Sequence, residues 1–221
     1  MTDFSAQPRP DFSRLRIDYM QRSLDEKDAD QDPIVQFTLW LNQAIAAAAH
    51  EPNAMTLATC TRDGVPSARI VLLKGVDERG LVFFTNYLSR KGRELDDNAR
   101  AATVFYWPEL ERQVRVEGQA SRTSASESAD YFNSRPTDAR YGSAVSPQSQ
   151  PIASRRELEQ RVQALRDRYP DGDVPCPPHW GGYRLRPTRM EFWQGRASRV
   201  HDRIEYLRGG EGQWTRRRLA P

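Results

Sequence analysis

The sequence predicts a mainly β protein with peripheral helices, in which antiparallel strands form a barrel or a sandwich. Three observations support this fold class. From residue 54 onward, eight short runs rich in β-branched and aromatic residues are separated by turn signals. Helical periodicity is confined to the intervals between these runs and to the region before them. The 221 residues suit one ordinary domain.

The N-terminal region is expected to comprise an arm and one helix. Residues 1–14 are polar and show no period, so we expect a mobile arm ahead of a single domain over residues 15–221. Asp32 and Pro33 form a helix start, an N-cap followed by proline at the first helical position. Apolar residues then recur at helical spacing, which predicts a helix over residues 33–49.

The central region predicts strands and one short helix. Asp63-Gly64 is a turn signal between two β-type runs, so residues 54–62 and 65–75 are expected to form a hairpin. The remaining central elements are expected to be a strand at 80–86, a helix at 89–98, and strands at 101–107 and 112–121.

The C-terminal region begins with a helix whose start is marked by a capping box, Ser124 and Glu127. We expect this helix to end before Pro136. Residues 137–152 are rich in Ser, Pro and Gln and are expected to form a loop. The last elements are expected to be a charged surface helix at 154–168 and strands around 189–194, 200–207 and 213–219.

The composition favours anionic small molecules and argues against several other partners. The net charge is +3 and the pI is near 9.0, a mildly basic balance that does not require nucleic acid. No apolar stretch is long enough to span a membrane, and the N-terminus has no apolar leader segment. The two cysteines and three histidines show neither disulfide nor metal-ligand spacing, so we expect no metal and a cytoplasmic location.

Three short segments carry the functional signal: RIVLLK at residues 69–74, SRKG at 89–92 and RVHDR at 199–203. The chain has three lysines among its 33 basic residues, and two of them, Lys74 and Lys91, lie in these segments. A lysine ammonium is a compact charge suited to a phosphate oxygen. The combination predicts a protein that binds phosphorylated small molecules.

The SRKG segment places Arg90 and Lys91 in the first turn of a helix. Cations there oppose the helix macrodipole, at a cost of about 0.3–1 kcal/mol each when they are exposed. An anion bound at this helix N-terminus would reverse the effect, because free N–H groups and both cations would contact it. The alternative is two solvated side chains on a surface helix.

Two further pairs are ambiguous on their own. Arg69 and Lys74 are five residues apart on one predicted strand, which places them on opposite faces unless a bulge intervenes. Each then serves a different ligand, or one of them is solvated. Tyr131 and Arg135 are four residues apart and share a helix face, which suits a phosphate or a carboxylate. An ordinary surface pair is the alternative.

The RVHDR segment places Arg199, His201 and Arg203 on one face of a predicted strand. Two arginines beside a histidine repel each other unless an anionic or π-rich group lies between them. Trp193, just upstream, is either an aromatic wall for such a group or a core residue. The alternative for the whole segment is a solvated strand face.

The sequence lacks the motifs of several enzyme classes. It has no nucleotide-binding glycine loop, no hydrolase nucleophile motif, no zinc-protease motif and no evident pair of catalytic carboxylates. A redox cofactor gripped through its phosphate would explain this, because the cofactor carries the chemistry. A basic β-barrel that binds single-stranded nucleic acid through stacked aromatics is the alternative from another class. Against it, the aromatics share no single platform.

Ten short segments occur in order along the chain: RIVLLK, FFTN, SRKG, LERQVRVEG, YFNSRP, SPQS, HWGGY, EFWQG, HDR and the terminal RLAP. From about Leu15 to the C-terminus, the chain resembles the pyridoxamine 5′-phosphate oxidases. The resemblance implies an FMN-binding split β-barrel, antiparallel in its strands, that forms a homodimer.

The resemblance also implies a set of site residues, some of them contributed by the other subunit. Those expected to line FMN are Arg69, Ile70, Val71, Leu72, Phe84, Thr85, Arg90, Lys91, Gln113, Gln148, Ser149, Trp193 and Arg203. Those expected to hold the substrate 5′-phosphate are Lys74, Tyr131, Arg135 and the residue at position 139. Arg199 and His201 would act on the substrate ring as catalytic residues, while Arg16 and Tyr19 would belong to a segment that folds over the site.

The implied reaction oxidises pyridoxamine 5′-phosphate or pyridoxine 5′-phosphate to pyridoxal 5′-phosphate, with hydride moving from C4′ to flavin N5. O2 reoxidises the flavin and gives H2O2, which would complete vitamin B6 cofactor synthesis or salvage. Ala139 stands where the family usually has a serine, so we expect one hydrogen bond fewer to the substrate phosphate. This departure raises the alternative of a split-barrel flavoprotein with a shifted substrate.

Overall fold

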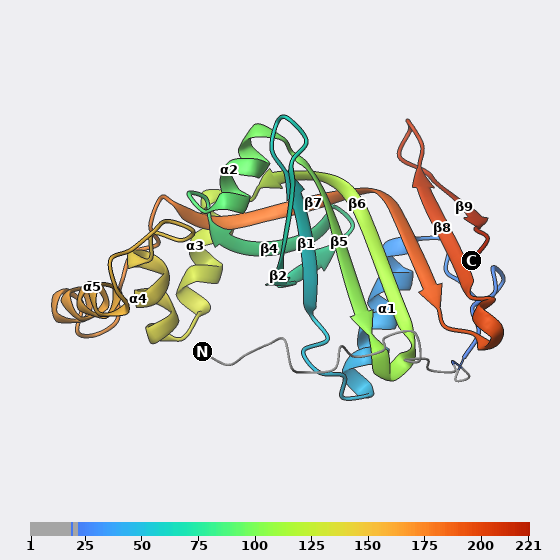
Figure 1. Ribbon diagram of the computed structural model, residues 1–221, viewed down its shortest axis with the longest axis horizontal. Helices are drawn as coiled ribbons and strands as arrows, with labels where there is room; N and C mark the ends of the chain where they lie inside the picture. Colours follow the sequence, from blue (N-terminus) through green and yellow to red (C-terminus); the bar gives the residue numbers. More distant parts are fainter. Residues whose placement is uncertain (1–18, 20–21) are drawn as a thin grey trace, which may run out of the picture.

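The computed structural model describes residue 19 and residues 22–221 (Figure 1). The predicted mobile arm at residues 1–14, the start of the domain at residue 15, and Arg16 lie outside the described residues. Tyr19 lies within them.

The described chain is built on one antiparallel sheet, in the order β2-β1-β5-β6-β7-β4-β3, with β8 on β7 and β9 on β8. The predicted mainly β, antiparallel architecture is therefore confirmed, with nine strands in the described residues where eight were expected. The bounds of the strands are β1 Ala54–Cys60, β2 Pro66–Leu72, β3 Gly75–Asp77, β4 Gly80–Asn86, β5 Arg100–Trp107, β6 Arg112–Arg122, β7 Trp180–Gln194, β8 Asp202–Arg208 and β9 Trp214–Arg218.

Five α-helices surround the sheet, and three of them gather at one end of the molecule (Figure 1). Their bounds are α1 Pro33–Ala46, α2 Arg90–Asp97, α3 Ala125–Ser134, α4 Thr137–Val145 and α5 Arg155–Arg168. In the part of the chain that the structure describes, no helix has the length and apolar character needed to cross a membrane.

Helix α1 begins as the sequence predicts. The Asp32 side chain accepts a hydrogen bond from the N–H of Ile34 at 2.8 Å, and Pro33 follows the cap. The buried rings of Phe37 and Trp40 then pack against the sheet, 4.9 Å from Phe105 and 5.3 Å from Phe192 between centroids. Because a fully buried Phe side chain contributes about 1.5–3 kcal/mol, this packing fixes the helix against the core.

Strand β7 is longer than predicted, because it begins at Trp180 instead of near residue 189. Gly181, Gly182 and Pro187 look like strand breakers in the sequence. In the structure, Pro187 lies where the register with β6 shifts between Glu117 and Gly118, so the bulge accommodates it. The first half of β7 pairs with β4 and the second half pairs with β8, so one strand carries both the β4-β3 branch and the β8-β9 branch of the sheet.

The loop predicted over residues 137–152 is wrong in its first half, which forms α4. Pro136 at the N-cap offers no side-chain hydrogen bond, so the sequence carries no local start signal. Tyr141 instead fixes the helix, because it is buried in a second small core with Phe132 and Trp180. Tertiary packing here overrides weak local propensity.

Candidate functional site

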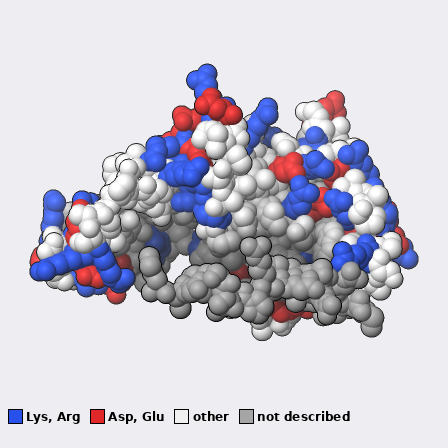
Figure 2. Space-filling view, viewed as in Figure 1, with Lys and Arg blue, Asp and Glu red and all other residues white. Residues whose placement is uncertain are grey.

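A pocket of about 770 Å³ lies among β2, the end of β4, the start of α2, and the α3–α4 region. This volume is typical of sites for cofactors and small molecules, which measure about 300–1,000 Å³. Basic side chains gather beside the hollow on this face (Figure 2). The predicted site residues that line it are Arg69, Ile70, Val71, Leu72, Lys74, Phe84, Thr85, Arg90, Lys91, Tyr131, Arg135, Gln148 and Ser149.

Arg69 and Lys74 line the same pocket, although they were expected on opposite strand faces. Strand β2 ends at Leu72, so the alternation does not continue to Lys74. The N–H of Lys74 instead bonds to the carbonyl of Val82 at 2.8 Å, as the chain turns toward β4. The expectation of separate faces is wrong because the strand is shorter than the RIVLLK segment.

Lys91 is a buried ammonium at the N-terminus of α2, with only 8% of its surface exposed. In the described part of the chain, its Nζ donates to Thr85 Oγ1 and Gln148 Oε1, both at 3.0 Å, and to the capping Ser89 at 3.3 Å. All three acceptors are neutral. Burial and the charge of Arg69 lower the pKa of Lys91 to about 8, against the opposing effect of Glu94. A cation in this position, in the first turn of a helix, fits a phosphate.

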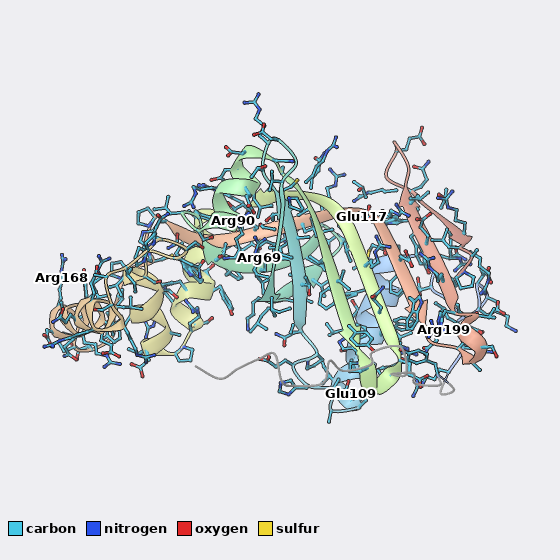
Figure 3. All side chains as sticks on the ribbon, in the orientation of Figure 1. Arg69, Arg90, Glu109, Glu117, Arg168 and Arg199 are labelled. Carbon is cyan, nitrogen blue, oxygen red and sulfur yellow. The ribbon has the colours of Figure 1, made fainter. Side chains whose placement is uncertain are left out.

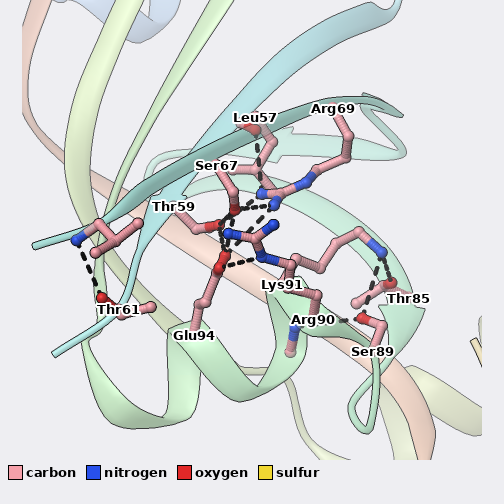
Figure 4. A network of polar contacts seen from close by, with 12 residues as sticks. Leu57, Thr59, Thr61, Ser67, Arg69, Thr85, Ser89, Arg90, Lys91 and Glu94 are labelled. Carbon is pink, nitrogen blue, oxygen red and sulfur yellow. Dashed lines mark hydrogen bonds and ion pairs between the residues drawn. The ribbon is translucent and has the colours of Figure 1, made fainter. Parts of the chain in front are cut away.

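Two arginines next to Lys91 are held by a buried carboxylate, that of Glu94 (Figure 4). Burial alone would raise the pKa of Glu94, but hydrogen bonds from Ser67, Thr59 and Arg90, with the charge of Arg69, lower it to about 2. The carboxylate is therefore ionised at neutral pH. Arg69, from β2, and Arg90, the first residue of α2, both line the pocket.

At the helical end of the pocket, aromatic rings and a guanidinium lie together. Phe84 stacks on Tyr131 at 3.9 Å between centroids, and Trp180 lies 5.5 Å from Phe84. Arg135 caps the end of α3, with its guanidinium 4.8 Å from the Trp180 ring and its Nη1 donating to Ser143 Oγ at 2.7 Å. Burial lowers the pKa of Arg135. The predicted convergence of Tyr131 and Arg135 on one space is observed.

Ala139 lies in the first turn of α4 and is not among the pocket-lining residues described here, whereas Gly142 and Ser143, one turn later, are. Several lining or supporting residues were not anticipated from the sequence. They are Glu94, Thr59, Ser67, Asn86, Ser143 and Trp180. Glu94 had a sequence signal, since it lies four residues after Arg90 on one helix.

Apart from Ala139, the other predicted residues within the described chain form a second group outside this pocket, at the end of the sheet where Figure 3 labels Arg199. Gln113, Trp193 and Arg203 are cross-strand neighbours on β6, β7 and β8. The His201 ring lies 4.6 Å from Trp193, and Tyr19 lies 5.6 Å from both rings. Within one chain, the predicted site is therefore divided into two parts.

The RVHDR segment is not a strand along its whole length, so the expected single face is wrong. Arg199 ends a 3₁₀ turn, and both Ser198 and Arg199 have left-handed φ values, 56° and 61°. The strand β8 starts only at Asp202. His201 Nδ1 accepts from the N–H of Arg196 at 3.1 Å, and burial and the charge of Arg199 lower its pKa. No glycine at these two positions signals the turn.

Comparisons with known proteins agree with this geometry. Residues 41–169 match the family described as pyridoxamine 5′-phosphate oxidase, and residues 180–221 match a pyridoxine 5′-phosphate oxidase C-terminal dimerisation region. A pyridoxine/pyridoxamine 5′-phosphate oxidase of Cyanothece sp. is 57% identical over 95% of this chain and 98% of its own. The enzyme of that name from Burkholderia multivorans is 59% identical over 94% and 97%.

The chain belongs to the pyridoxamine 5′-phosphate oxidase family. Its relatives of that name make it an oxidoreductase. Among solved structures, PhzG from Burkholderia lata 383, in complex with tetrahydrophenazine-1-carboxylic acid, superposes with a TM-score of 0.86 at 34% identity, over 91% of this chain and 99% of PhzG.

A second solved structure shares the fold of this oxidase family member. It is a pyridoxamine 5′-phosphate oxidase-related, FMN-binding protein from Nostoc punctiforme, with a TM-score of 0.66 at 19% identity over 87% of this chain and 98% of its own. The split β-barrel expected from the resemblance is confirmed by these neighbours. Within the described residues, no group of three or more His, Cys, Asp or Glu side chains is placed to hold a metal ion.

Proposed function

We propose that this protein is an FMN-dependent oxidase that converts pyridoxamine 5′-phosphate and pyridoxine 5′-phosphate to pyridoxal 5′-phosphate. The observation that carries the proposal is Lys91, a buried ammonium with neutral partners at a helix N-terminus, in a pocket of cofactor size. The names of relatives at 57–59% identity support the same substrates. The reaction belongs to vitamin B6 cofactor synthesis or salvage, and we place it in the cytoplasm.

FMN fits the residues at the α2 end of the pocket. Arg69, Arg90 and Lys91 would hold its phosphate, with Ile70–Leu72, Phe84, Thr85, Gln148 and Ser149 around the rest of the molecule. Bound FMN would supply a flavin N5 that accepts hydride from C4′ of the substrate and returns the electrons to O2 as H2O2.

The helical end of the pocket fits the substrate phosphate. Lys74, Tyr131 and Arg135 bring an ammonium, a phenol and a guanidinium to one space, and a phosphate can accept hydrogen bonds from all three. Ser143 would hold Arg135 in place through the 2.7 Å bond to its guanidinium. The aromatic stack of Phe84, Tyr131 and Trp180 would exclude water from this end.

We further propose a homodimer in which a second copy completes each site. The C-terminal match to a dimerisation region supports this, as does the separation of the Trp193–His201 group from the pocket of its own chain. Arg199 and His201 would orient the substrate ring. Gln113, Trp193 and Arg203 would face the flavin, and Tyr19 would cover the site. The lowered pKa of His201 favours a neutral imidazole at pH 7.

The proposal is tested by the purified protein itself. We expect flavin absorbance, release of FMN on denaturation, and formation of pyridoxal 5′-phosphate with H2O2 from both substrates. Because PhzG shares the fold, tetrahydrophenazine-1-carboxylic acid is assayed in parallel. Oxidation of that compound without oxidation of either B6 phosphate would overturn the substrate assignment, and absence of bound flavin would overturn the cofactor.

A further inference from the structure

The side chain of Glu94 lies behind the phosphate-binding end of the pocket rather than on its wall. We infer that Glu94 is a positioning residue of the FMN phosphate site, which orients Arg69 and Arg90 and offsets one of the positive charges gathered there. This inference rests on the proposed function, because it assigns a role toward FMN.

Both carboxylate oxygens of Glu94 are fully engaged (Figure 4). Oε1 accepts from Arg90 Nε at 2.8 Å. Oε2 accepts from Ser67 Oγ at 2.6 Å and from Thr59 Oγ1, and it lies 3.4 Å from Arg69 Nη2. With 4% of the residue exposed, the Glu94 carboxylate itself is shielded from water, although the Arg90 side chain that binds it is 55% exposed.

The network joins three elements of the fold. Glu94 and Arg90 belong to α2, Arg69 and Ser67 to β2, and Thr59 to β1. Arg69 is held on its other side by Thr59 Oγ1, at 2.5 Å from Nη1, and by the carbonyl of Leu57 at 3.3 Å. An arginine restrained in this way loses little further freedom when it binds phosphate, so the restraint preorganises the site.

The charge balance supports the same role. Arg69, Arg90 and Lys91 carry three positive charges, and Glu94 reduces the sum to two, which matches a phosphate monoester of about −1.5 to −2 at pH 7. A carboxylate on the wall would repel the phosphate. Glu94 avoids this because Arg69 and Arg90, which line the pocket, lie between its oxygens and the bound anion.

Glu94 also acts on Lys91. The charged groups that act on this ammonium are Arg69 from β2 and Glu94 from α2, while its hydrogen-bond partners are neutral. Glu94 favours the protonated lysine and Arg69 disfavours it. Removal of the carboxylate would leave Lys91 facing an uncompensated guanidinium.

The experiment compares Glu94→Gln with Asp97→Asn, which removes a charge from the exposed end of the same helix. Full-length protein is stripped of flavin, and the Kd values for FMN and for riboflavin are measured by flavin fluorescence between pH 6 and pH 10. Riboflavin lacks the phosphate, so it reports on the rest of the pocket.

We expect Glu94→Gln to weaken FMN binding about 10- to 100-fold, the effect of losing hydrogen bonds to charged groups. Riboflavin affinity should change less than twofold, and the loss of FMN affinity at alkaline pH should begin at a lower pH than in wild type. Asp97→Asn should match wild type for both ligands.

The following results would overturn either the inference about Glu94 or the proposed function. Equal losses for FMN and riboflavin, or no loss of FMN affinity in Glu94→Gln, overturn the inference while leaving the cofactor proposal intact. If wild type binds neither flavin, the proposed function itself fails. If Glu94→Gln does not fold, Thr59→Val, which removes one donor to Glu94 and keeps its charge, should weaken FMN about 3- to 10-fold and spare riboflavin; an unchanged FMN affinity there overturns the inference.

Discussion

Lys91 is almost fully buried and yet its described hydrogen bonds go to neutral oxygens. Its pKa of about 8, lowered from 10.5 chiefly by burial, means that the ammonium is charged below pH 8 and loses its proton above it. If the proposed site binds FMN through the charged form, FMN affinity should stay nearly constant from pH 7 to 8 and then fall by up to tenfold per pH unit. Fluorescence titrations between pH 7 and 10 measure this.

Lys91→Gln is the control for that experiment. It should bind FMN about 10- to 100-fold more weakly at pH 7, because a hydrogen bond to a charged group is lost. Its affinity should not decline above pH 8. A wild-type affinity that stays level to pH 9.5 would contradict the assignment of Lys91 to the phosphate.

Arg199 provides a second test at the level of single residues. It lies beside His201 in a turn outside the pocket of its own chain. If both residues orient the substrate ring, Arg199→Met should lower kcat/KM at least tenfold while each protomer keeps its FMN. Steady-state kinetics and flavin content are measured on the same preparation. Loss of flavin with normal kinetics per bound flavin would reverse the roles of Arg199 and Arg203.

Sequence reasoning found Arg90 and Lys91 because two cations in one helix turn are locally unfavourable without an anion. It did not find the support for Arg69, because the hydroxyls that share the Glu94 carboxylate come from Ser67 and Thr59, 27 and 35 residues earlier in the chain. Contacts over such distances have no local pattern. The residues that line the pocket were therefore more predictable than those that hold them in position.

The contact between Ser143 on helix α4 and Arg135 can be tested by mutation. Ser143 holds Arg135 from this helix, so Ser143→Ala should raise KM for pyridoxamine 5′-phosphate about tenfold, with kcat little changed. Ala139→Ser, one turn earlier, restores the hydroxyl usual in the family and is expected to lower KM. Steady-state assays with both variants compare the two turns. If Ser143→Ala leaves KM unchanged and Ala139→Ser lowers it, the first turn of α4 holds the phosphate.

The start of α2 requires a glycine. A Cβ atom on Gly92 would lie 2.1 Å from the carbonyl oxygen of Tyr87, so the helix would have to move. Gly92→Ala should therefore destabilise the flavin-free protein by about 1–3 kcal/mol, as overpacking does. Gly142→Ala is the control, since its Cβ meets nothing within 4 Å on helix α4. Thermal unfolding should show a lower Tm for the first variant and an equal or higher Tm for the second.

The helices and the hairpin whose ends carry clear capping or turn residues were predicted correctly. Asp32 and Ser124 cap α1 and α3 as expected, and the hairpin of β1 and β2 pairs in full register around its Asp63-Gly64 turn. The first half of β7 was missed because its glycines suggest a break. In the structure, a Cβ on Gly182 would lie 2.6 Å from Thr123 Oγ1, so this glycine serves close packing within a strand.

At the scale of the molecule, the outer face of the sheet has two unlike halves. The register aligns one row of side chains, which alternate with core positions, across seven strands: Ile70, Thr56, Val104, Arg115, Glu191, Glu205 and Arg217. In this row Glu191 and Glu205 are buried and paired with arginines. The β2-β1-β5 half of this row is largely apolar, and Ile70 is 63% exposed. Such a face suits burial against a second copy of the chain.

A charge placed in the apolar half tests this assembly. Val104→Asp should dissociate the dimer and reduce FMN content, because each site would lose the residues contributed by the partner. Val65→Asp is the control, since this valine lies in the β1–β2 turn and is 55% exposed. Sedimentation velocity and flavin absorbance measure both effects together. A monomer that retains FMN and full activity would contradict the shared site.

The family resemblance implied that some site residues come from the other subunit, but the local sequence patterns could not show which of them lie apart within one chain. RIVLLK and HDR each carried a recognisable pattern, but alternation along a strand does not tell how far apart two strands lie. The separation depends on the order of strands in the sheet, which is set by the packing of the whole core.

Strand β7 connects the two separated groups of predicted site residues. Trp180 at its start lines the pocket, while Trp193 near its end belongs to the group that we propose completes the site of a second copy. The two are thirteen residues apart on one strand, a length along the strand of about 43 Å at roughly 3.3 Å per residue. Because one strand carries both groups, its length between them contributes to the spacing of the two sites in the proposed dimer. We expect a one-residue deletion between Trp180 and Trp193 to shorten the distance between the two groups and to turn every following side chain to the opposite face. Both sites of the proposed dimer should then lose activity together.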